Sequence, residues 1–198
     1  MTPEAKSERE AQIAEAAYAV LAEKGFAGLS MLAVAKRAKA SNETLYRWYG
    51  DKTGLLRALI ARDAAELAEA LDMLLMRGGD AAQTLDAVGA CLLDKLLSAR
   101  SVALIRAAAA DSGDSLGIAL KAAGQESLMP RLVPLFVRLK ARGRVRSPAA
   151  KAAELWIDVL LGDWVLRGVT GAMGPPDASA RAARIGRAAE IVLVQPAR

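Results

Sequence analysis

The stretch from Ser30 to Lys52 carries side chains whose types and spacing suit contact with nucleic acid. It reads SMLAVAKRAKASNETLYRWYGDK, and its apolar residues alternate with polar and cationic ones in a way that core packing alone does not require. Asn and Glu can bond to base edges in the major groove, whereas Thr, Tyr, Arg and Lys donate to phosphate oxygens. Two short helical patterns within the stretch are separated by a break at Lys39-Ala40. This arrangement predicts a helix-turn-helix whose second helix enters a groove of DNA.

One predicted helix precedes this stretch, and a second lies at its start. The first covers residues 8–24, with Ser7 as a possible N-cap, and Gly25 follows where a left-handed C-cap is needed. The second covers residues 31–38 and begins after Ser30, which can cap it.

The third predicted helix begins at Ser41 or Asn42 and runs to about Tyr49. Leu45 and Tyr49 lie four residues apart and point to one side, where we expect them to pack against the two earlier helices. A helix of one or two turns is unstable alone, so this one depends on that packing.

The remainder of the chain is predicted to be helical as well. Gly50-Asp51 interrupts the pattern, and Asp51 can cap a long connecting helix that starts at residue 52. We therefore expect an all-α protein, with a three-helix helix-turn-helix head over residues 1–50 and a helical domain over residues 51–198. The later helices are predicted over residues 52–76, 81–98, 102–110, 116–142 (one interrupted helix or two), 149–170 and 178–194.

Composition agrees with a helical, mildly basic protein. Hydrophobic residues make up 54% of the chain and the formal net charge is +5, which permits an anionic partner without proving one. One segment of basic residues coincides with the suspected reader, where two acids, Glu43 and Asp51, accompany seven cations. The cations are Lys36, Arg37, Lys39, Arg47, Lys52, Arg57 and Arg62.

The chain lacks most of the residues that usually form disulfides, metal sites and catalytic sites. The chain has one cysteine, Cys91, and no histidine, so we expect no disulfide within the chain, no metal site, no cofactor and no catalytic residues. The N-terminus, MTPEAKSEREA, is polar and carries acids, so we expect no signal peptide. Charged residues interrupt each long apolar run, which predicts a cytoplasmic protein with no membrane association.

The last two predicted helices carry unusual surfaces. Apolar residues occupy nearly all faces of 149–170, and 178–194 has small residues that allow another helix to approach closely. Such a pair could bury itself within one chain or form half of the four-helix bundle of a dimer. We favour a homodimer formed through residues 149–194.

With these residues in view, the chain resembles a known family. Residues 7–60 resemble the N-terminal DNA-binding domain of TetR-family transcriptional regulators, through IAEAAYAVLAEKGFAGLSMLAVAKRAKASNETLYRWYGDKTGLLRALI. The C-terminal half is similar to the AefR-like subgroup, through LWIDVLLGDWVLRGVTGAMGPPD. The resemblance implies a homodimer that binds a palindromic double-stranded DNA operator. It also implies a small-molecule effector, which binds in the C-terminal domain, moves the connecting helix and releases the DNA.

The resemblance also implies roles for individual residues. Asn42, Glu43 and Tyr46 match positions that commonly touch base edges, although Glu43 could merely favour the positive helix N-terminus. For Trp48 the alternative is packing within the head. Thr44, Trp48 and Lys52 match positions that usually contact phosphate, and Tyr46 could do so too. Ser30 and Arg47 are further candidates for phosphate contact.

Two residues depart from the family pattern. Lys39 stands where the family most often has Gly, and a left-handed lysine would be unfavourable by roughly 1 kcal/mol relative to glycine. Leu32 occupies a position where some members place a base-reading Arg, so we expect the third helix to read the operator alone.

Candidates for the effector pocket are large or soft residues on the later helices, although such residues are more often simply core. Asp158 and Asp163 could orient a ligand or face water. With so few aromatic residues we expect an apolar or amphiphilic effector. The candidates are Met73, Met76, Cys91, Met129, Phe136, Trp156 and Trp164.

A ligand-responsive transcriptional repressor is thus the leading hypothesis. A helical enzyme is disfavoured because the chain lacks histidine, a phosphate-cradling glycine loop and any paired nucleophile and base. The alternative is a helical interaction protein of the same fold that does not bind an operator.

Overall fold

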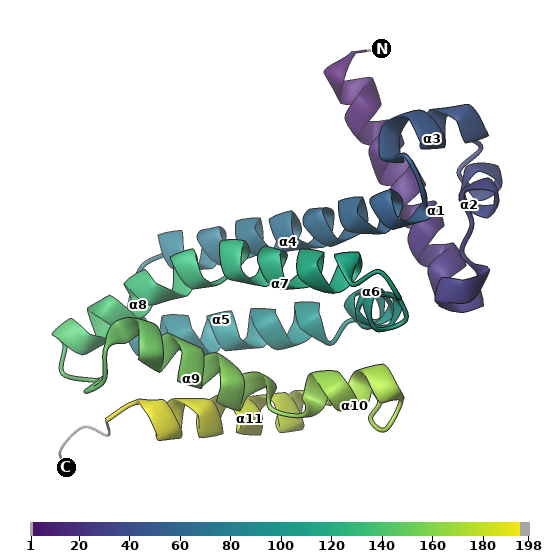
Figure 1. Ribbon diagram of the computed structural model, residues 1–198. Coiled ribbons are helices and arrows are strands. Elements are labelled where there is room, and N and C mark those ends of the chain that lie inside the picture. Colours follow the sequence, from purple (N-terminus) through teal and green to yellow (C-terminus); the bar gives the residue numbers. More distant parts are fainter. Residues whose placement is uncertain (1, 195–198) are drawn as a thin grey trace. The chain divides into compact units, whose positions relative to one another are not determined.

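The computed structural model describes residues 2–194, and all regular secondary structure in that range is helical (Figure 1). The all-α class predicted from the sequence is confirmed. In chain order the helices are α1 Pro3–Gly28, α2 Met31–Arg37, α3 Asn42–Tyr49, α4 Lys52–Met76, α5 Ala81–Leu96, α6 Ala99–Ala109, α7 Ser115–Ser127, α8 Met129–Ala141, α9 Ala149–Leu161, α10 Trp164–Thr170 and α11 Ala178–Val192.

The helices form two compact units. The first comprises the described residues up to Arg62 together with Ala99–Lys121, and the second comprises Asp63–Ser98 together with the described residues from Ala122 onward. Helix α4 therefore contributes residues to both units, and α6 belongs with the N-terminal helices. The predicted boundary between residues 50 and 51 falls inside the first unit.

Helix α1 begins earlier than predicted. Its N-cap is Thr2, whose hydroxyl accepts from the Ala5 amide at 3.3 Å, so the assignment of Ser7 as N-cap is wrong. A threonine followed by proline is a strong helix start, because proline has no N–H that needs a partner there. Gly25 has the positive φ expected of it, 65°, but its ψ of −176° is extended, so it kinks α1 instead of capping it and the helix runs on to Gly28.

The core of the first unit is built by α1 and its neighbours. Helix α1 contacts both α2 and α6, and α2 contacts α3. Apart from Tyr18, the buried side chains of α1, α2 and α3 are small or aliphatic, which lets the short helices α2 and α3 pack closely. They include Ile13, Ala17, Val20 and Leu21 of α1, Met31, Val34 and Ala35 of α2, and Leu45 of α3.

The core of the second unit is centred on α9, which packs against α8 and α11, while α5 contacts all three (Figure 1). Trp156 of α9 is fully buried and its ring centroid lies 6.0 Å from that of Phe136 on α8. A forked ion pair ties α4 to α8, because the Arg131 guanidinium donates to both Asp72 oxygens at 2.9 and 2.7 Å.

Two predicted helices are divided in the structure. Residues 116–142 form α7 and α8, with the break just before Pro130, while Pro134 lies inside α8. Residues 149–170 were predicted as one helix, and this is wrong. Gly162 adopts φ 48° and ψ −129°, which ends α9 at Leu161 and starts α10 at Trp164.

Among the described residues, no helix is long and apolar enough to cross a membrane.

Candidate nucleic-acid interface

Helix α3 starts at a well-formed cap. The Ser41 hydroxyl accepts from the Thr44 amide at 3.0 Å and lies 2.8 Å from the Thr44 hydroxyl. Of the two predicted capping residues, the structure therefore selects Ser41. At the other end Gly50 has φ 77°, and its amide bonds to the Tyr46 carbonyl at 2.9 Å. An N-cap of this kind stabilises a helix by about 1 kcal/mol, a large contribution for eight residues.

One face of α3 is anchored and the opposite face is open. Leu45 is wholly buried, whereas Asn42, Glu43 and Arg47 are exposed and Tyr46 is 50% exposed. Exposure of these four polar or amphipathic side chains around one buried leucine leaves them available to an outside partner. The three residues predicted to touch bases thus share the surface of the first two turns.

The predicted phosphate contacts on α3 have different surroundings. Thr44 is half-buried and its hydroxyl is held near that of Ser41, while Arg47 is exposed. Trp48 is also half-buried and packs edge-on against Tyr49, with ring centroids 6.3 Å apart. Both interpretations of Trp48 thus have support, because it packs within the head and keeps part of its surface open.

Ser30 and Lys52 hold local structure as well. The Ser30 hydroxyl accepts from the Ala33 amide at 3.2 Å, which confirms its predicted role as N-cap of α2. The Lys52 ammonium donates to the Phe26 carbonyl at 3.2 Å and lies 3.9 Å from the centroid of the Phe26 ring. Lys52 therefore ties the start of α4 to the end of α1, a contact that the sequence did not predict.

The connection between α2 and α3 contains a left-handed lysine. Lys39 has φ 51°, so it adopts the conformation for which the family most often uses glycine. Arg9 of α1 reaches this connection and donates to the carbonyls of Ala38 at 3.2 Å and Lys39 at 2.6 Å. Arg9 lies before the predicted reader and was not singled out from the sequence.

Tyr49 was predicted to be core and is half-buried. Burial raises the pKa of its phenol above the ordinary value, the Glu10 carboxylate raises it further, and Arg62 lowers it. The fold therefore favours the neutral phenol.

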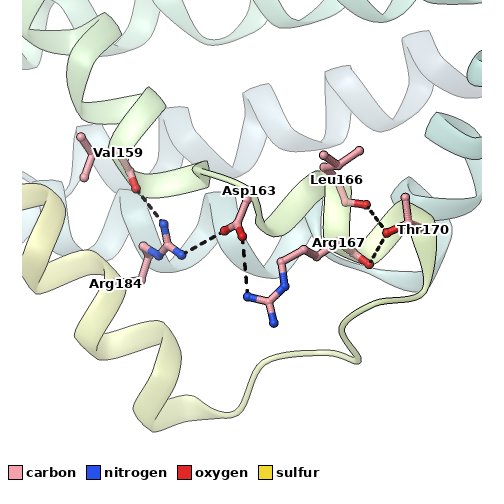
Figure 2. Close-up of polar contacts among 6 residues, drawn as sticks. All are labelled: Val159, Asp163, Leu166, Arg167, Thr170 and Arg184. Carbon is pink, nitrogen blue, oxygen red and sulfur yellow. Dashed lines mark hydrogen bonds and ion pairs between the residues drawn. The ribbon is translucent and has the colours of Figure 1, made fainter.

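A separate open cleft lies on α9, α10 and α11, with a volume of about 640 Å³. Figure 2 shows Arg184 of α11 reaching toward the end of α9, where it donates to the Val159 carbonyl at 3.3 Å and pairs with Asp163 at 3.5 Å. Its guanidinium also stacks over the Trp164 ring, 4.5 Å from the centroid. Gly162 has φ 48° and ψ −129°, a conformation that other residues rarely adopt, and a Cβ there would also displace the Arg184 guanidinium.

The residues predicted for an effector pocket occupy several environments. Phe136 and Trp156 are fully buried in contact with each other, and Cys91 and Met129 are partly buried against the same core. Trp164 lines the open cleft. Met73 and Met76 are 59% and 85% exposed, and side chains so exposed do not line an enclosed cavity.

Two family models match the chain. The one described as "Bacterial regulatory proteins, tetR family" matches residues 13–59, and "AefR-like transcriptional repressor, C-terminal domain" matches residues 83–195, over half of the chain. The chain belongs to the TetR family of transcriptional regulators. The resemblance noted in the sequence, including the AefR-like C-terminal half, is thereby confirmed.

Individual relatives agree with this membership. The HTH-type transcriptional repressor KstR of Mycolicibacterium smegmatis is 32% identical over 83 residues, which cover 42% of this chain and 41% of that protein. A TetR-family regulator from Mesorhizobium loti superposes with a TM-score of 0.79 at 21% identity, covering 98% of this chain and 100% of that one. FadR from Bacillus subtilis, solved in complex with stearoyl-CoA, gives a TM-score of 0.71 at 17% identity, covering 91% and 95%. The two structures show that the TetR fold is shared.

Proposed function

We propose that this TetR-family protein is a repressor that binds a palindromic operator as a homodimer and is released by a small-molecule effector. The observation that carries the proposal is the surface of α3. Asn42, Glu43 and Tyr46 are exposed there, and buried Leu45 anchors the same helix to the head. An asparagine suits bidentate bonding to adenine and a glutamate can accept from cytosine N4, so both offer sequence readout.

Phosphate contacts would fix the register of α3 on the duplex. The side chains proposed for this are Ser30, Thr44, Arg47, Trp48 and Lys52. Ser30 and Thr44 sit at helix N-termini, where unpaired amides also favour an anion. The Lys52 ammonium has three donors, of which the Phe26 carbonyl takes one, so two remain for a phosphate oxygen.

The proposed dimer uses residues 149–194. Leu155 of α9, Leu166 of α10 and Ile191 of α11 are large apolar side chains that remain 46–65% exposed in the single chain. On α11 the neighbouring Ala183 and Gly186 are small and exposed, which would allow a second copy of the helix to approach closely. A two-fold dimer in turn explains why the operator should be palindromic.

The proposed effector is an apolar or amphiphilic molecule that carries a hydrogen-bond acceptor. Trp156 is wholly buried among apolar side chains, and its indole Nε1 has no acceptor among the described residues. Buried indole N–H groups normally have a partner, so a ligand oxygen would gain from bonding to this one. FadR, which shares the fold, binds stearoyl-CoA, a molecule of this amphiphilic kind.

The test is a titration of labelled duplexes that tile the DNA directly upstream of the protein's own gene. We expect tight binding to one duplex, weak binding to its scrambled version, and a steep decrease in affinity with added salt. Sedimentation of the protein at micromolar concentration should show a dimer. Equal affinity for native and scrambled duplexes would instead support the alternative, an interaction protein of the same fold without operator binding.

A further inference from the structure

The connection between α2 and α3 closes α2 with a hydrogen-bonded motif. The Lys39 amide donates to the Lys36 carbonyl at 3.3 Å, and the Ala40 amide donates to the Ala35 carbonyl at 2.9 Å. This is the Schellman pattern, and it places Lys39 at the position that must be left-handed. Glycine is usual at that position because a Cβ crowds the backbone there. An interaction that favours this conformation would offset the cost of placing a lysine there.

Arg9 supplies that interaction from α1, thirty residues earlier in the chain. Its Nη1 donates to the Ala38 carbonyl at 3.2 Å and its Nη2 to the Lys39 carbonyl at 2.6 Å. The Gln12 side-chain oxygen accepts from the same guanidinium at 2.7 Å and steadies it. The φ and ψ angles of Lys39 set the directions of these two carbonyls relative to each other. A planar guanidinium that binds both carbonyls therefore favours the conformation in which they point to it together.

The position of Arg9 also suits its charge. The carbonyls of Ala38 and Lys39 lie at the C-terminal end of α2, where the helix dipole is negative and the last carbonyls lack intrahelical partners. A guanidinium therefore stabilises the end of the helix and the connection at once.

We infer that Arg9 is a positioning residue for the DNA reader, which acts by holding Lys39 left-handed. Ser41, two residues beyond Lys39, caps α3, so the conformation of Lys39 sets where α3 begins and which way Asn42 and Glu43 face. We call the two hydrogen bonds from Arg9 to the Ala38 and Lys39 carbonyls the Arg9 clamp. The clamp rests on these hydrogen bonds, whereas its consequence for operator binding rests on the proposed function.

A double-mutant cycle tests the inference. Arg9→Met keeps most of the apolar stem and removes the donors, and Lys39→Gly removes the crowding that makes the clamp necessary. Operator affinity of the full chain is measured by fluorescence anisotropy on the upstream duplex for both single variants and the double variant, at several salt concentrations. Arg37→Met is the matched control, because Arg37 pairs with both Glu23 oxygens at 2.7 Å.

We expect Arg9→Met to weaken operator binding about tenfold in the Lys39 background, because a tenfold change in affinity corresponds to the free-energy cost of one left-handed residue. In the Lys39→Gly background we expect a loss of about twofold or less. Arg37→Met should show the same effect in both backgrounds. An equal loss for Arg9→Met in both backgrounds would overturn the inference. So would a loss accompanied by a shallower salt dependence, since that indicates a direct phosphate contact by Arg9.

Hydrogen exchange separates this inference from the proposed function. If the native protein binds no duplex, operator binding fails, and the clamp is judged from the amides of Ala40 and Thr44 in the full chain. Both amides are hydrogen-bonded across the connection and the α3 cap. Arg9→Met should speed their exchange in the Lys39 background, and Lys39→Gly should restore their protection. Unchanged exchange in Arg9→Met would refute the clamp.

Discussion

Lys52 is assigned two roles, one in stability and one in DNA binding, and two measurements on the variant Lys52→Met can separate them. Its ammonium contacts the Phe26 carbonyl at 3.2 Å and the Phe26 ring at 3.9 Å, and it is also proposed to bind phosphate. Lys52→Met keeps the apolar stem and removes both interactions of the charge. A charged hydrogen bond contributes about 1.5–3 kcal/mol and an exposed cation–π contact about 0.5–1 kcal/mol. Because Lys52 is half-buried, we expect a net loss of about 1–3 kcal/mol of stability.

The phosphate role has a different signature. One lost phosphate contact lowers the slope of log affinity against log salt by about 0.9, so a dimer that loses two contacts should show a slope shallower by about 1.8. The assay combines thermal unfolding followed by circular dichroism with duplex titration over a range of salt. Lys52→Arg, which keeps the charge, should retain the slope. Lys121→Met, at an exposed lysine of α7 without a proposed DNA role, is the control for the loss of one positive charge.

The combination of melting temperature and salt slope tests each role of Lys52 separately. A lower melting temperature with an unchanged salt slope would refute the phosphate contact and leave Lys52 as a link between α1 and α4. A shallower slope with unchanged stability would refute the importance of the Phe26 contact. If neither quantity changed relative to Lys121→Met, the account of Lys52 would be wrong in both parts.

Four further substitutions, one of them with a matched control, test other parts of the structure. Leu45→Ala should destabilise the head by about 2–5 kcal/mol and abolish operator binding, measured by denaturant unfolding and anisotropy, because the wholly buried leucine anchors α3. Asn42→Ala should reduce discrimination at one base pair by about 1–3 kcal/mol on single-substitution duplexes, without changing the salt slope. Ile191→Glu should give monomers in sedimentation, whereas Val137→Glu on α8, equally exposed but outside residues 149–194, should leave the dimer intact. Because the pKa of Tyr49 is raised in the folded protein, the neutral phenol contributes stability that is intact below the ordinary phenol pKa of about 10. That stability is lost as the pH rises through the pKa of Tyr49 in the folded protein. Tyr49→Phe should therefore remove this loss of stability at high pH.

The sequence predicted the features that depend on neighbouring residues. Ser30, Ser41 and Asp51 cap the helices that follow them, and each cap is a hydrogen bond to an amide three residues later. Such bonds follow from local spacing, so the starts of α2, α3 and α4 were predicted well. The positive φ of Gly25 likewise follows from the helix end that it occupies, whereas that of Lys39 was suggested only by the glycine that the family most often has there.

What the sequence could not show depends on contacts between distant residues. The break at Gly162 was not predicted because apolar residues resume directly after Gly162-Asp163, and the Arg184 side chain that lies against the glycine belongs to another helix. The link between Lys52 and Phe26 joins residues 26 positions apart. No periodicity or spacing rule connects such pairs, so they emerge only when the helices are packed together.

The Arg9 clamp has a practical consequence for anyone who transplants DNA-binding heads between regulators. The family model of the head begins at residue 13, so a graft of residues 13–59 would look complete and would include both α2 and α3. It would leave Arg9 behind, and with it the two hydrogen bonds that fix the Lys39 conformation. Such a chimera needs either the whole first turns of α1 from this protein or a glycine at position 39.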